Sequence, residues 1–308
     1  MITHLGFEEW RPESPTVASL GNYDGVHRGH QAILGAVVED ARKIGVQSVA
    51  LTFDPVPKKV LSPDTAPPLI QTLQQRLECL AQCRLDRTIV VAFNQDFARL
   101  VPDEFVERIL VGHLKIRELV VGENFAFGYR KQGNLALLRE MGGKHGFSVR
   151  VISEVQVDGQ RVSSTAIREM VKEGRMEEAS RFLSRPFAVE GTVVRGEQLG
   201  GKLGIPTANI KPENEVLPAN GVYVTVCLTN SKRYSSVTNV GLRPTVGGKK
   251  LTVETHLLDF DADLYDHKME LQFLAKLRDE RRFSGIEELK AAIRSDIEST
   301  RAYFLSHS

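Results

Sequence analysis

A glycine-rich turn between an apolar run and an amphipathic pattern constrains this chain more than any other stretch. The apolar run is 17–20, the turn is Gly21–His30, and residues 33–44 repeat apolar side chains at helical spacing. This order predicts a strand, a turn and a helix. Such a turn leaves backbone N–H groups at a helix N-terminus, where the helix dipole favours an anion. We therefore expect a phosphate-binding turn.

Two histidines lie three residues apart in this turn, at His27 and His30, and Gly29 stands between them. On a first helical turn, that spacing places both side chains on one face, where both can point at one phosphate. Gly29 keeps the surface between them open. The arrangement suits nucleotidyl transfer, because its catalysis is mostly positioning and stabilisation of developing phosphate charge. The alternative is an ordinary turn with one capping and one exposed histidine, which the strand–turn–helix context disfavours.

The composition excludes several classes of protein. With 308 residues, the chain is long enough for two domains, and its formal net charge of +1 gives no basic surface for nucleic acid or membranes. No apolar segment reaches the roughly 18 residues of a membrane span, and the N-terminus lacks a secretion signal pattern. Cys79, Cys83 and Cys227 lack zinc-ligand spacing, so we expect small buried thiols. These features predict a soluble, cytoplasmic protein; they do not predict its self-association.

Residues 1–152 alternate strand and helix signals. The expected strands are 17–20, 46–53, 87–93, 118–121 and 147–152. Such alternation predicts an α/β domain on a doubly wound, Rossmann-like parallel sheet. Ligands of these sheets bind at the carboxyl ends of strands. We therefore expect the Gly21–His30 turn, the segment 52–55 and Asn124 to lie along one edge.

A second phosphate-binding segment is expected where Ser163, Ser164 and Thr165 open a further helix and Arg168 follows. Hydroxyl groups at a helix start are usually caps. A guanidinium beside free backbone N–H groups, however, makes a phosphate site. Together with the histidine turn, this segment is expected to hold a triphosphate from the other side.

The pattern changes near residue 185, and short strand signals separated by turns continue to about residue 275. The expected strands are 189–194, 221–228, 234–240 and 251–258. They predict a small antiparallel β-barrel, and an apolar stripe from Ile286 to Phe304 predicts a terminal helix packed on it. We therefore predict two domains, residues 1–185 and 186–308.

The barrel segment contains glycines that resemble part of a P-loop. Residues 196–202 fit its first half, but Leu203 replaces the required Ser or Thr, and Pro206 prevents the helix that must follow. A glycine loop over phosphates remains a good interpretation, because Gly200 and Gly204 let the backbone approach a ligand closely.

Oxygen ligands and a carboxylate follow this loop. Thr207 and Asn209 place two oxygens on one side of an extended segment, and Mg²⁺ accepts such donors. In the strand 251–257, alternation places Glu254 and His256 on the same face. If that face lines the barrel mouth near Thr207, Glu254 can accept a proton from an attacking hydroxyl. The alternative is a solvated surface glutamate, and we assign His256 a structural role.

These motifs, in this order, resemble those of bacterial bifunctional riboflavin kinase/FAD synthetases. The matching segments are 21–30, 52–55, 163–168, 204–209, 220–223 and 253–256, and the resemblance runs from about residue 15 to 295. It implies an N-terminal domain that transfers an adenylyl group from ATP to FMN, giving FAD and pyrophosphate. It also implies a C-terminal domain that phosphorylates riboflavin to FMN with ATP and Mg²⁺. Departures from the family's usual residues occur at Tyr23, Lys202, Ile205 and Val246.

The resemblance also implies roles for individual residues. In the adenylyltransferase, the catalytic groups are His27, His30 and Arg168. The ATP-binding positions there are Asn22, Asp24, Gly29, Ser163, Ser164 and Thr165, and the flavin-binding positions are Pro57, Asn124 and Phe127. In the kinase, Glu254 is the general base on the terminal ribityl hydroxyl and Arg278 lies over the flavin. The remaining kinase positions are Thr207 and Asn209 as Mg²⁺ ligands, and Gly200, Lys202 and Gly204 near ATP.

Three other functions stay open at this point. Class I aminoacyl-tRNA synthetases share the H-x-G-H turn, but their lysine-rich second signature has no counterpart here. A non-catalytic flavin-binding protein needs no base, metal site or phosphate clamp, so the presence of Glu254 and His30 argues against it. In the third alternative, one of the two domains alone is active.

Overall fold

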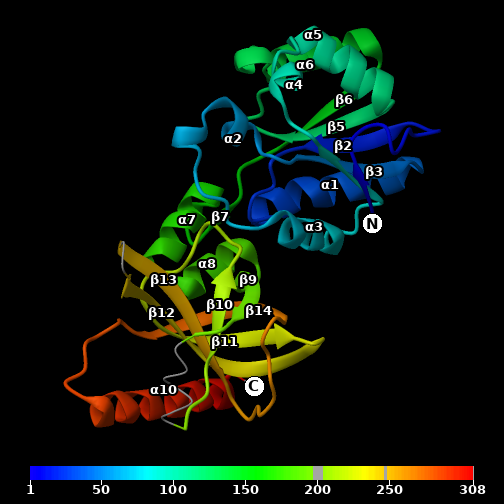
Figure 1. The fold of residues 1–308 in the computed structure, drawn as a ribbon. Helices are drawn as coiled ribbons and strands as arrows, with labels where there is room; N and C mark the ends of the chain where they lie inside the picture. Colours follow the sequence, from blue (N-terminus) through cyan, green and yellow to red (C-terminus); the bar gives the residue numbers. More distant parts are fainter. Residues whose placement is uncertain (197–203, 246–247, 308) are drawn as a thin grey trace. The chain divides into compact units, whose positions relative to one another are not determined.

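The computed structural model describes residues 1–196, 204–245 and 248–307, which pack into two units (Figure 1). One unit contains Met1–Pro68 and Leu73–Ser163, and the other contains Leu69–Thr72 and Ser164–Ser308. By packing, the two helices before residue 185 therefore belong with the second unit. The division at residue 185 as the limit between two activities stays a prediction.

The first unit is built on a parallel sheet of six strands in the order β1-β4-β3-β2-β5-β6. The strands are β1 (Ile2–Leu5), β2 (Thr16–Leu20), β3 (Gln47–Phe53), β4 (Arg87–Val91), β5 (Ile116–Gly122) and β6 (Ser148–Ile152). The predicted doubly wound sheet is confirmed, but the prediction missed β1. This edge strand has no apolar inner face, since Ile2 and Leu5 are 54% and 63% exposed and the buried side chain is His4.

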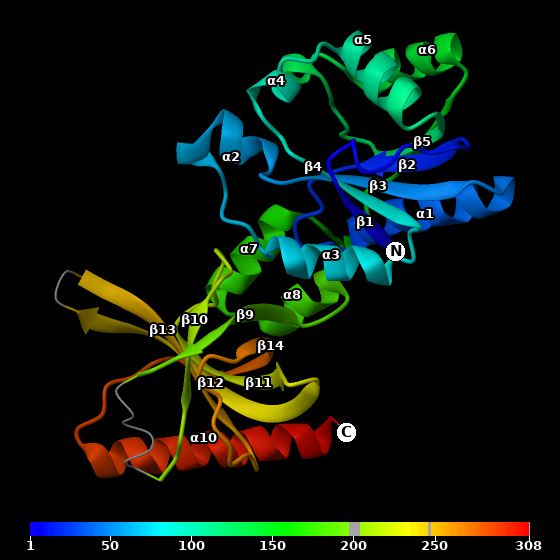
Figure 2. The same ribbon diagram turned by 45° about the vertical axis from the view of Figure 1, so that its right-hand side comes forward.

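Helices cover both faces of this sheet (Figure 2). α1 (Arg28–Ile44) and α3 (Leu73–Gln82) lie on one face, whereas α5 (Pro102–Glu104), the π-helical segment η2 (Phe105–His113) and α6 (Leu135–His145) lie on the other. The smaller elements are α2 (Pro57–Leu61), η1 (Pro63–Thr65), α4 (Gln95–Ala98), η3 (Tyr129–Lys131), β7 (Gln156–Val157) and β8 (Gln160–Arg161).

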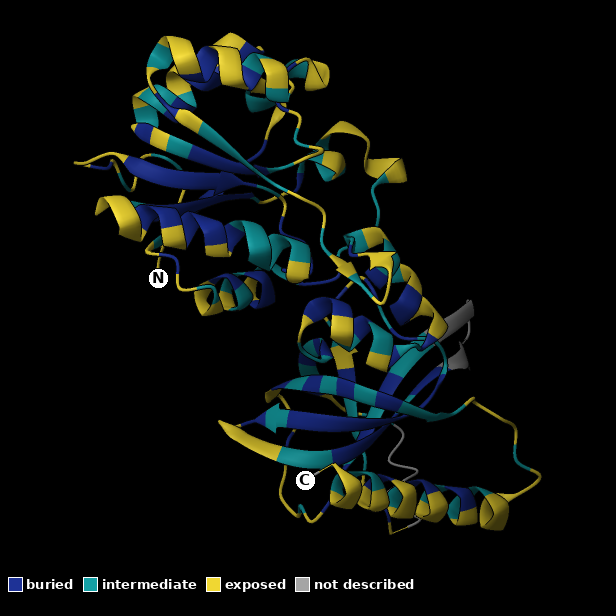
Figure 3. Cartoon of the chain, turned by 180° about the vertical axis from the view of Figure 1, so that it is seen from behind, coloured by how far each residue is buried: buried dark blue, intermediate teal, exposed yellow. Residues whose placement is uncertain are grey.

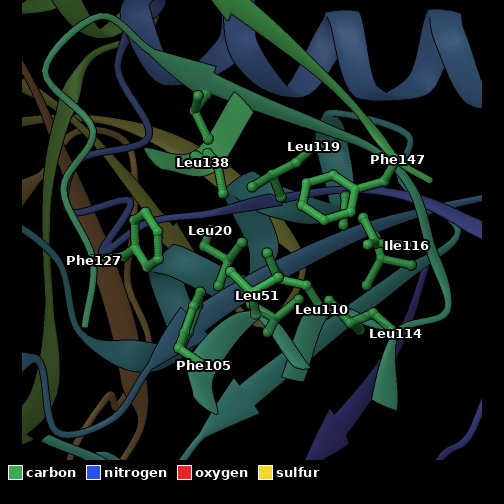
Figure 4. Packing of buried hydrophobic residues seen from close by; sticks show 14 of the residues in the cluster. Leu20, Leu51, Phe105, Leu110, Leu114, Ile116, Leu119, Phe127, Leu138 and Phe147 are labelled. Atoms are coloured by element: carbon green, nitrogen blue, oxygen red, sulfur yellow. The ribbon is translucent and has the colours of Figure 1, made fainter. Parts of the chain in front are cut away.

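Alternating strand residues form the two cores of this unit. Val17 packs toward α1, whereas Ala18 and Leu20 join the cluster on the opposite face (Figure 4). In the burial view, the strands are largely buried and the outer helix faces exposed (Figure 3). Of the cysteines, Cys79 and Cys83 are half-buried, against expectation, and burial raises the pKa of the Cys227 thiol to about 12.

The strand order sets the place of a ligand site. β2 has β3 on one side and β5 on the other, and the chain reaches β5 only after forming β3 and β4. The loops that leave β2 and β5 therefore run in opposite directions, and sheets of this type bind their ligands at such a point, at the carboxyl ends of the strands. The Gly21–His30 turn follows β2, and residues 123–127 follow β5.

The second unit is a closed antiparallel barrel in the strand order β10-β13-β12-β11-β14-β9. The strands are β9 (Phe187–Val194), β10 (Ala208–Pro212), β11 (Gly221–Thr229), β12 (Lys232–Thr245), β13 (Gly248–Leu257) and β14 (Lys268–Arg278). The helices are α7 (Ser164–Glu173), α8 (Met176–Leu183) and α10 (Ile286–Ser306). The predicted barrel and terminal helix are confirmed, and β10 and β14 are additions to the predicted strands.

The terminal helix packs on β11 and β12, and Leu289, Ile293, Ile297 and Phe304 of the predicted stripe are half-buried at this contact. Ala292, Asp296 and Thr300 are its buried residues, and Ile286 is 61% exposed. Across the described ranges, no helix combines the length and apolar character that crossing a membrane requires.

Candidate active sites

The turn after β2 has an unusual backbone. Tyr23, Gly25 and Val26 have φ values of 49°, 89° and 36°. A positive φ is unfavourable for a β-branched residue, at a cost of about 1–3 kcal/mol, and it persists when the surroundings enforce it. Tyr23 and Val26 are each 1% exposed, and the Val26 N–H donates to the Tyr23 carbonyl at 3.0 Å. Burial thus holds the turn in the shape that delivers His27 to the helix.

The two histidines lie together at the start of α1. His27 is the N-cap, and its Nδ1 accepts a hydrogen bond from the His30 N–H at 3.3 Å. Their rings stack with centroids 3.6 Å apart and an angle of 16° between the planes. The ring of Tyr23 lies nearly perpendicular to that of His30, with centroids 5.3 Å apart. Because Nδ1 of His27 is an acceptor, the neutral ring carries its proton on Nε2, as a donor. The expected common face for both side chains is confirmed.

Gly29 is where a side chain would press on this pair. A Cβ at this position would lie 3.2 Å from Cε1 and 3.3 Å from Nδ1 of His27, closer than ordinary van der Waals contact. The same Cβ would be 4.0 Å from the carbonyl oxygen of Val162, so the chain passes the turn just before Ser163. Glycine at this position therefore keeps both the ring stack and the adjoining surface accessible.

A buried arginine that the sequence analysis missed lies beneath the turn. Arg76 on α3 is 3% exposed, and its Nη1 donates to the Asn22 carbonyl at 3.0 Å and its Nη2 to the Phe53 carbonyl at 2.9 Å. Asp24, 5% exposed, also acts electrostatically on Arg76. A sequence signal existed, because Arg76 falls at helical spacing within the apolar stripe of its helix.

The predicted flavin positions have different surroundings. Phe127 is 6% exposed inside the apolar cluster, with its ring 5.4 Å from that of Phe105 (Figure 4). The half-buried Phe125 stacks on Phe127 at 5.8 Å. Asn124 is exposed and donates to Glu154 at 2.6 Å. Pro57 is half-buried at the first position of α2. Their contact with flavin stays a prediction.

The second phosphate-binding segment is divided between the units. Ser163 closes the first unit, whereas Ser164, Thr165 and Arg168 lie on α7 in the second. Ser163, Ser164 and Arg168 are half-buried and Thr165 is exposed. The expected grip on one triphosphate by these residues and the histidines stays a prediction.

The barrel brings the kinase candidates together through strand register. β10 and β13 pair Asn209 directly with Glu254, and β12 and β13 pair Asn239 with the same glutamate. Directly opposed residues share a face with Cβ atoms about 4.5–5.5 Å apart. Glu254 thus stands between two amide side chains, and Asn239 is a candidate that sequence reasoning missed. Finding it requires the strand pairing, which no local pattern reveals.

Thr207 lies at the end of this row, one residue before β10 begins. The Nδ1–H of His256 donates to the Pro206 carbonyl at 2.7 Å, which ties the segment before Thr207 to β13. Beside it is a cavity of about 260 Å³, lined by Thr207, Ala208, the segment 260–265, and Thr255 and Leu257 from the face of β13 opposite to Glu254. The bond from His256, which shares a face with Glu254, supports the predicted nearness of that face to Thr207, and it is the structural bond expected of His256.

The remaining kinase candidates are only partly described. Gly204 is exposed with φ 74°, and the Asn209 amide lies against Gly196. The predicted ATP-binding residues Gly200 and Lys202 lie outside the described residues. In the described ranges, no group of three or more His, Cys, Asp or Glu is arranged to hold a metal ion.

Arg278 has a defined partner at the end of β14. Its Nε and Nη2 donate to the two carboxylate oxygens of Asp296 on α10 at 2.9 and 2.8 Å. Its guanidinium also lies 5.7 Å from the ring of Phe283. Asp296 is 8% exposed, so this forked pair is a firm link between the barrel and α10.

Comparison with known proteins gives the same order of domains. A family model described as FAD synthetase matches residues 10–166, and one described as riboflavin kinase matches residues 183–304. A bifunctional riboflavin kinase/FMN adenylyltransferase from Pseudomonas fluorescens is 41% identical over 299 residues, covering 96% of each chain. The protein of the same description from Escherichia coli strain K12 is 37% identical over 294 residues, covering 95% of this chain and 94% of that protein.

The likeness extends to a solved structure. A crystal structure from Streptococcus pneumoniae, described as a macrolide-efflux protein, matches with a TM-score of 0.89 and 27% identity. The match covers 98% of this chain and 99% of that one. The fold described above is therefore shared over nearly the whole length of both proteins.

Proposed function

Because the chain belongs to the family of bifunctional riboflavin kinases/FMN adenylyltransferases, it carries both activities, and we propose which of its residues perform each. The C-terminal domain phosphorylates riboflavin to FMN. The N-terminal domain adenylylates FMN to FAD. ATP as the shared substrate, Mg²⁺ as its companion ion and all residue roles below are parts of the proposal.

In adenylyl transfer, the FMN phosphate attacks the α-phosphorus of ATP, and pyrophosphate leaves. The proposal rests on the stacked pair of His27 and His30 at the start of α1, whose ring centroids are 3.6 Å apart. His27 offers an Nε2–H donor to a phosphate oxygen, and the backbone N–H groups of the first turn offer more. Such fixed donors stabilise charge that develops on the phosphates as the bond breaks. Ser163, Ser164, Thr165 and Arg168 are proposed to bind the same triphosphate.

In phosphoryl transfer, Glu254 is the general base. Its carboxylate accepts the proton of the terminal ribityl hydroxyl as that oxygen attacks the γ-phosphorus of ATP. The supporting observation is the register that sets Asn209 directly beside Glu254. This places a proton acceptor within a few ångströms of a candidate Mg²⁺ ligand, as phosphoryl transfer requires.

The donor set near Glu254 fits Mg²⁺. The Thr207 hydroxyl and Asn209 amide supply neutral oxygens, and Mg²⁺ usually completes its coordination with waters and substrate phosphates. When bound, the ion neutralises phosphate charge. The 260 Å³ cavity shares Thr207 with this donor pair, but Thr255 and Leu257 also line it, from the face of β13 opposite to Glu254, so we assign it to no substrate. Gly200, Lys202 and Gly204 are proposed to cover ATP, and Arg278 to approach the flavin.

One assay tests both activities. The pure protein is incubated with riboflavin, ATP and Mg²⁺ while FMN, FAD, ADP and pyrophosphate are followed. We expect FMN with ADP first, then FAD with pyrophosphate. A non-catalytic flavin binder would form none of these products, and a chain with one active domain would form FMN but no FAD, or FAD only from supplied FMN.

Two variants assign the products to the two sites. His30→Ala should abolish FAD formation and leave FMN formation intact. Glu254→Gln keeps the shape of the side chain and removes the base, so it should abolish FMN formation while supplied FMN is still adenylylated. Loss of both products in either variant, with the protein still folded, would contradict two separate sites.

A further inference from the structure

We propose that Arg76 is a positioning residue of the adenylyltransferase: its buried guanidinium ties together the loops that follow β2 and β3 and so fixes the histidine turn against the triphosphate. The inference rests on the adenylyltransferase activity of this domain. Arg76 stands on α3, away from the turn in sequence, and acts on the turn through main-chain carbonyls.

The guanidinium bridges two neighbouring strands at their carboxyl ends. Nη1 donates to the carbonyl of Asn22, two residues after β2 ends, and Nη2 donates to the carbonyl of Phe53, the last residue of β3. The Asn22 carbonyl accepts a second bond, from the Thr52 hydroxyl at 3.2 Å. Arg76 and Thr52 thus hold the beginning of the turn, and the His27 cap holds its end.

A turn with this backbone needs such restraint. Tyr23 and Val26, both at positive φ, lie between Asn22 and His27. Residues with a strained backbone keep that conformation only while several surrounding contacts enforce it. Releasing the Asn22 carbonyl removes a restraint at the point where the strained segment begins. The displacement then reaches the histidine rings, whose stacking depends on the end of the same segment.

The burial of Arg76 is difficult to explain by stability alone. Its ion-pair partner is Asp54, whose Oδ1 lies 3.5 Å from Nη2, and that side chain is 45% exposed. Among the described residues, its Nε has no hydrogen-bond partner. Burial lowers the pKa of Arg76, and the charges of Asp54 and Asp24 raise it in part. Burying a cation with incomplete compensation is costly, which favours a use for the group at this site.

The test compares variants of Arg76 with a matched arginine at the opposite ends of the strands. Arg87 begins β4 and bonds to Gln47 at 3.1 Å and His4 at 2.9 Å, so Arg87→Met also removes a hydrogen-bonded guanidinium from this sheet. FMN adenylylation is measured against ATP concentration for both variants, and riboflavin phosphorylation is measured on the same samples. Thermal unfolding reports the folded fraction.

We expect Arg76→Met to lower kcat/KM for ATP in adenylylation by about 10- to 100-fold, the effect of losing charged hydrogen bonds. Phosphorylation should stay within about twofold, as should both activities of Arg87→Met. Arg76→Lys should be intermediate, because an ammonium keeps the charge without the planar fork. Added guanidinium ion should partly restore adenylylation by Arg76→Ala.

Two results would overturn the inference. One is a folded Arg76→Met protein with unchanged ATP kinetics. The other is a loss of adenylylation that is fully accounted for by the fraction of unfolded protein, with Arg76→Lys no better than Arg76→Met and no rescue of Arg76→Ala by guanidinium. Arg76 would then have a structural role only. A wild-type protein that forms no FAD would instead remove the activity on which the inference rests.

Discussion

A methyl group added at Gly29 should separate the function of the histidine turn from its stability. Gly29 and Gly35 both lie in α1, and replacing either with alanine removes a glycine from a helix, which contributes about 0.5–1 kcal/mol of stability. At Gly35, the new Cβ meets nothing within 4 Å. At Gly29, it lies 3.2 Å from the His27 ring.

The magnitudes follow from these contacts. To relieve the 3.2 Å contact, the His27 ring must move by a few tenths of an ångström, and the cap and the ring stack move with it. Losing the cap costs about 1 kcal/mol, so Gly29→Ala should leave stability nearly unchanged. Gly35→Ala should gain about 1–4 °C in the Tm of its domain. Misplaced groups cost up to about 100-fold in rate, and we expect a 10- to 100-fold loss of FAD formation for Gly29→Ala.

The assay measures FAD formation from FMN, riboflavin phosphorylation and thermal unfolding for both variants. Phosphorylation serves as an internal control, because it occurs in the other domain. If Gly29→Ala gained as much stability as Gly35→Ala and formed FAD at the wild-type rate, the ring geometry would not matter for catalysis. If Gly35→Ala also lost FAD formation, the effect would belong to the helix and not to His27.

Two further predictions concern other parts of the chain. Asp296→Asn weakens the forked pair with Arg278, so it should destabilise the barrel domain by about 1–3 kcal/mol and raise the KM for riboflavin. An unchanged KM would show that Arg278 does not take part in flavin binding. The ring of His113 packs on that of Phe7 with centroids 4.5 Å apart, and burial lowers the pKa of His113. As the pH drops below about 6.5, the unfolded chain therefore binds a proton at this histidine before the folded protein does, and the free energy of unfolding falls. His113→Gln should therefore lose less Tm between pH 7.5 and 5.5 than the wild type, and an equal loss would contradict this account.

The features predicted from sequence are those that local spacing determines. His27 and His30 share a face because a helix repeats every ~3.6 residues, and Glu254 and His256 share one because a strand repeats every ~2 residues. By contrast, the helical spacing of Arg76 indicates that it is buried but not what it contacts, which depends on bringing α3 beneath two strand ends. The contacts of Asn239 depend in the same way on the register of β12. Such long-range pairings leave no local pattern. The strand β1 was missed for a different reason, because its exposed Ile2 and Leu5 give no core-facing signal.

Strand alternation also decides on which side of the barrel wall the proposed base Glu254 lies. The interior holds Thr225, Ser236, Thr238 and Thr255, all fully buried and joined by hydroxyl hydrogen bonds of 2.7–2.9 Å. A barrel this small is filled by its own side chains. Because Glu254 neighbours Thr255 along the strand, its side chain points to the other face of the wall. The row of Glu254, Asn209 and Asn239 therefore lies on the outer face of the wall, and the bonded hydroxyls inside hold the strands that carry it.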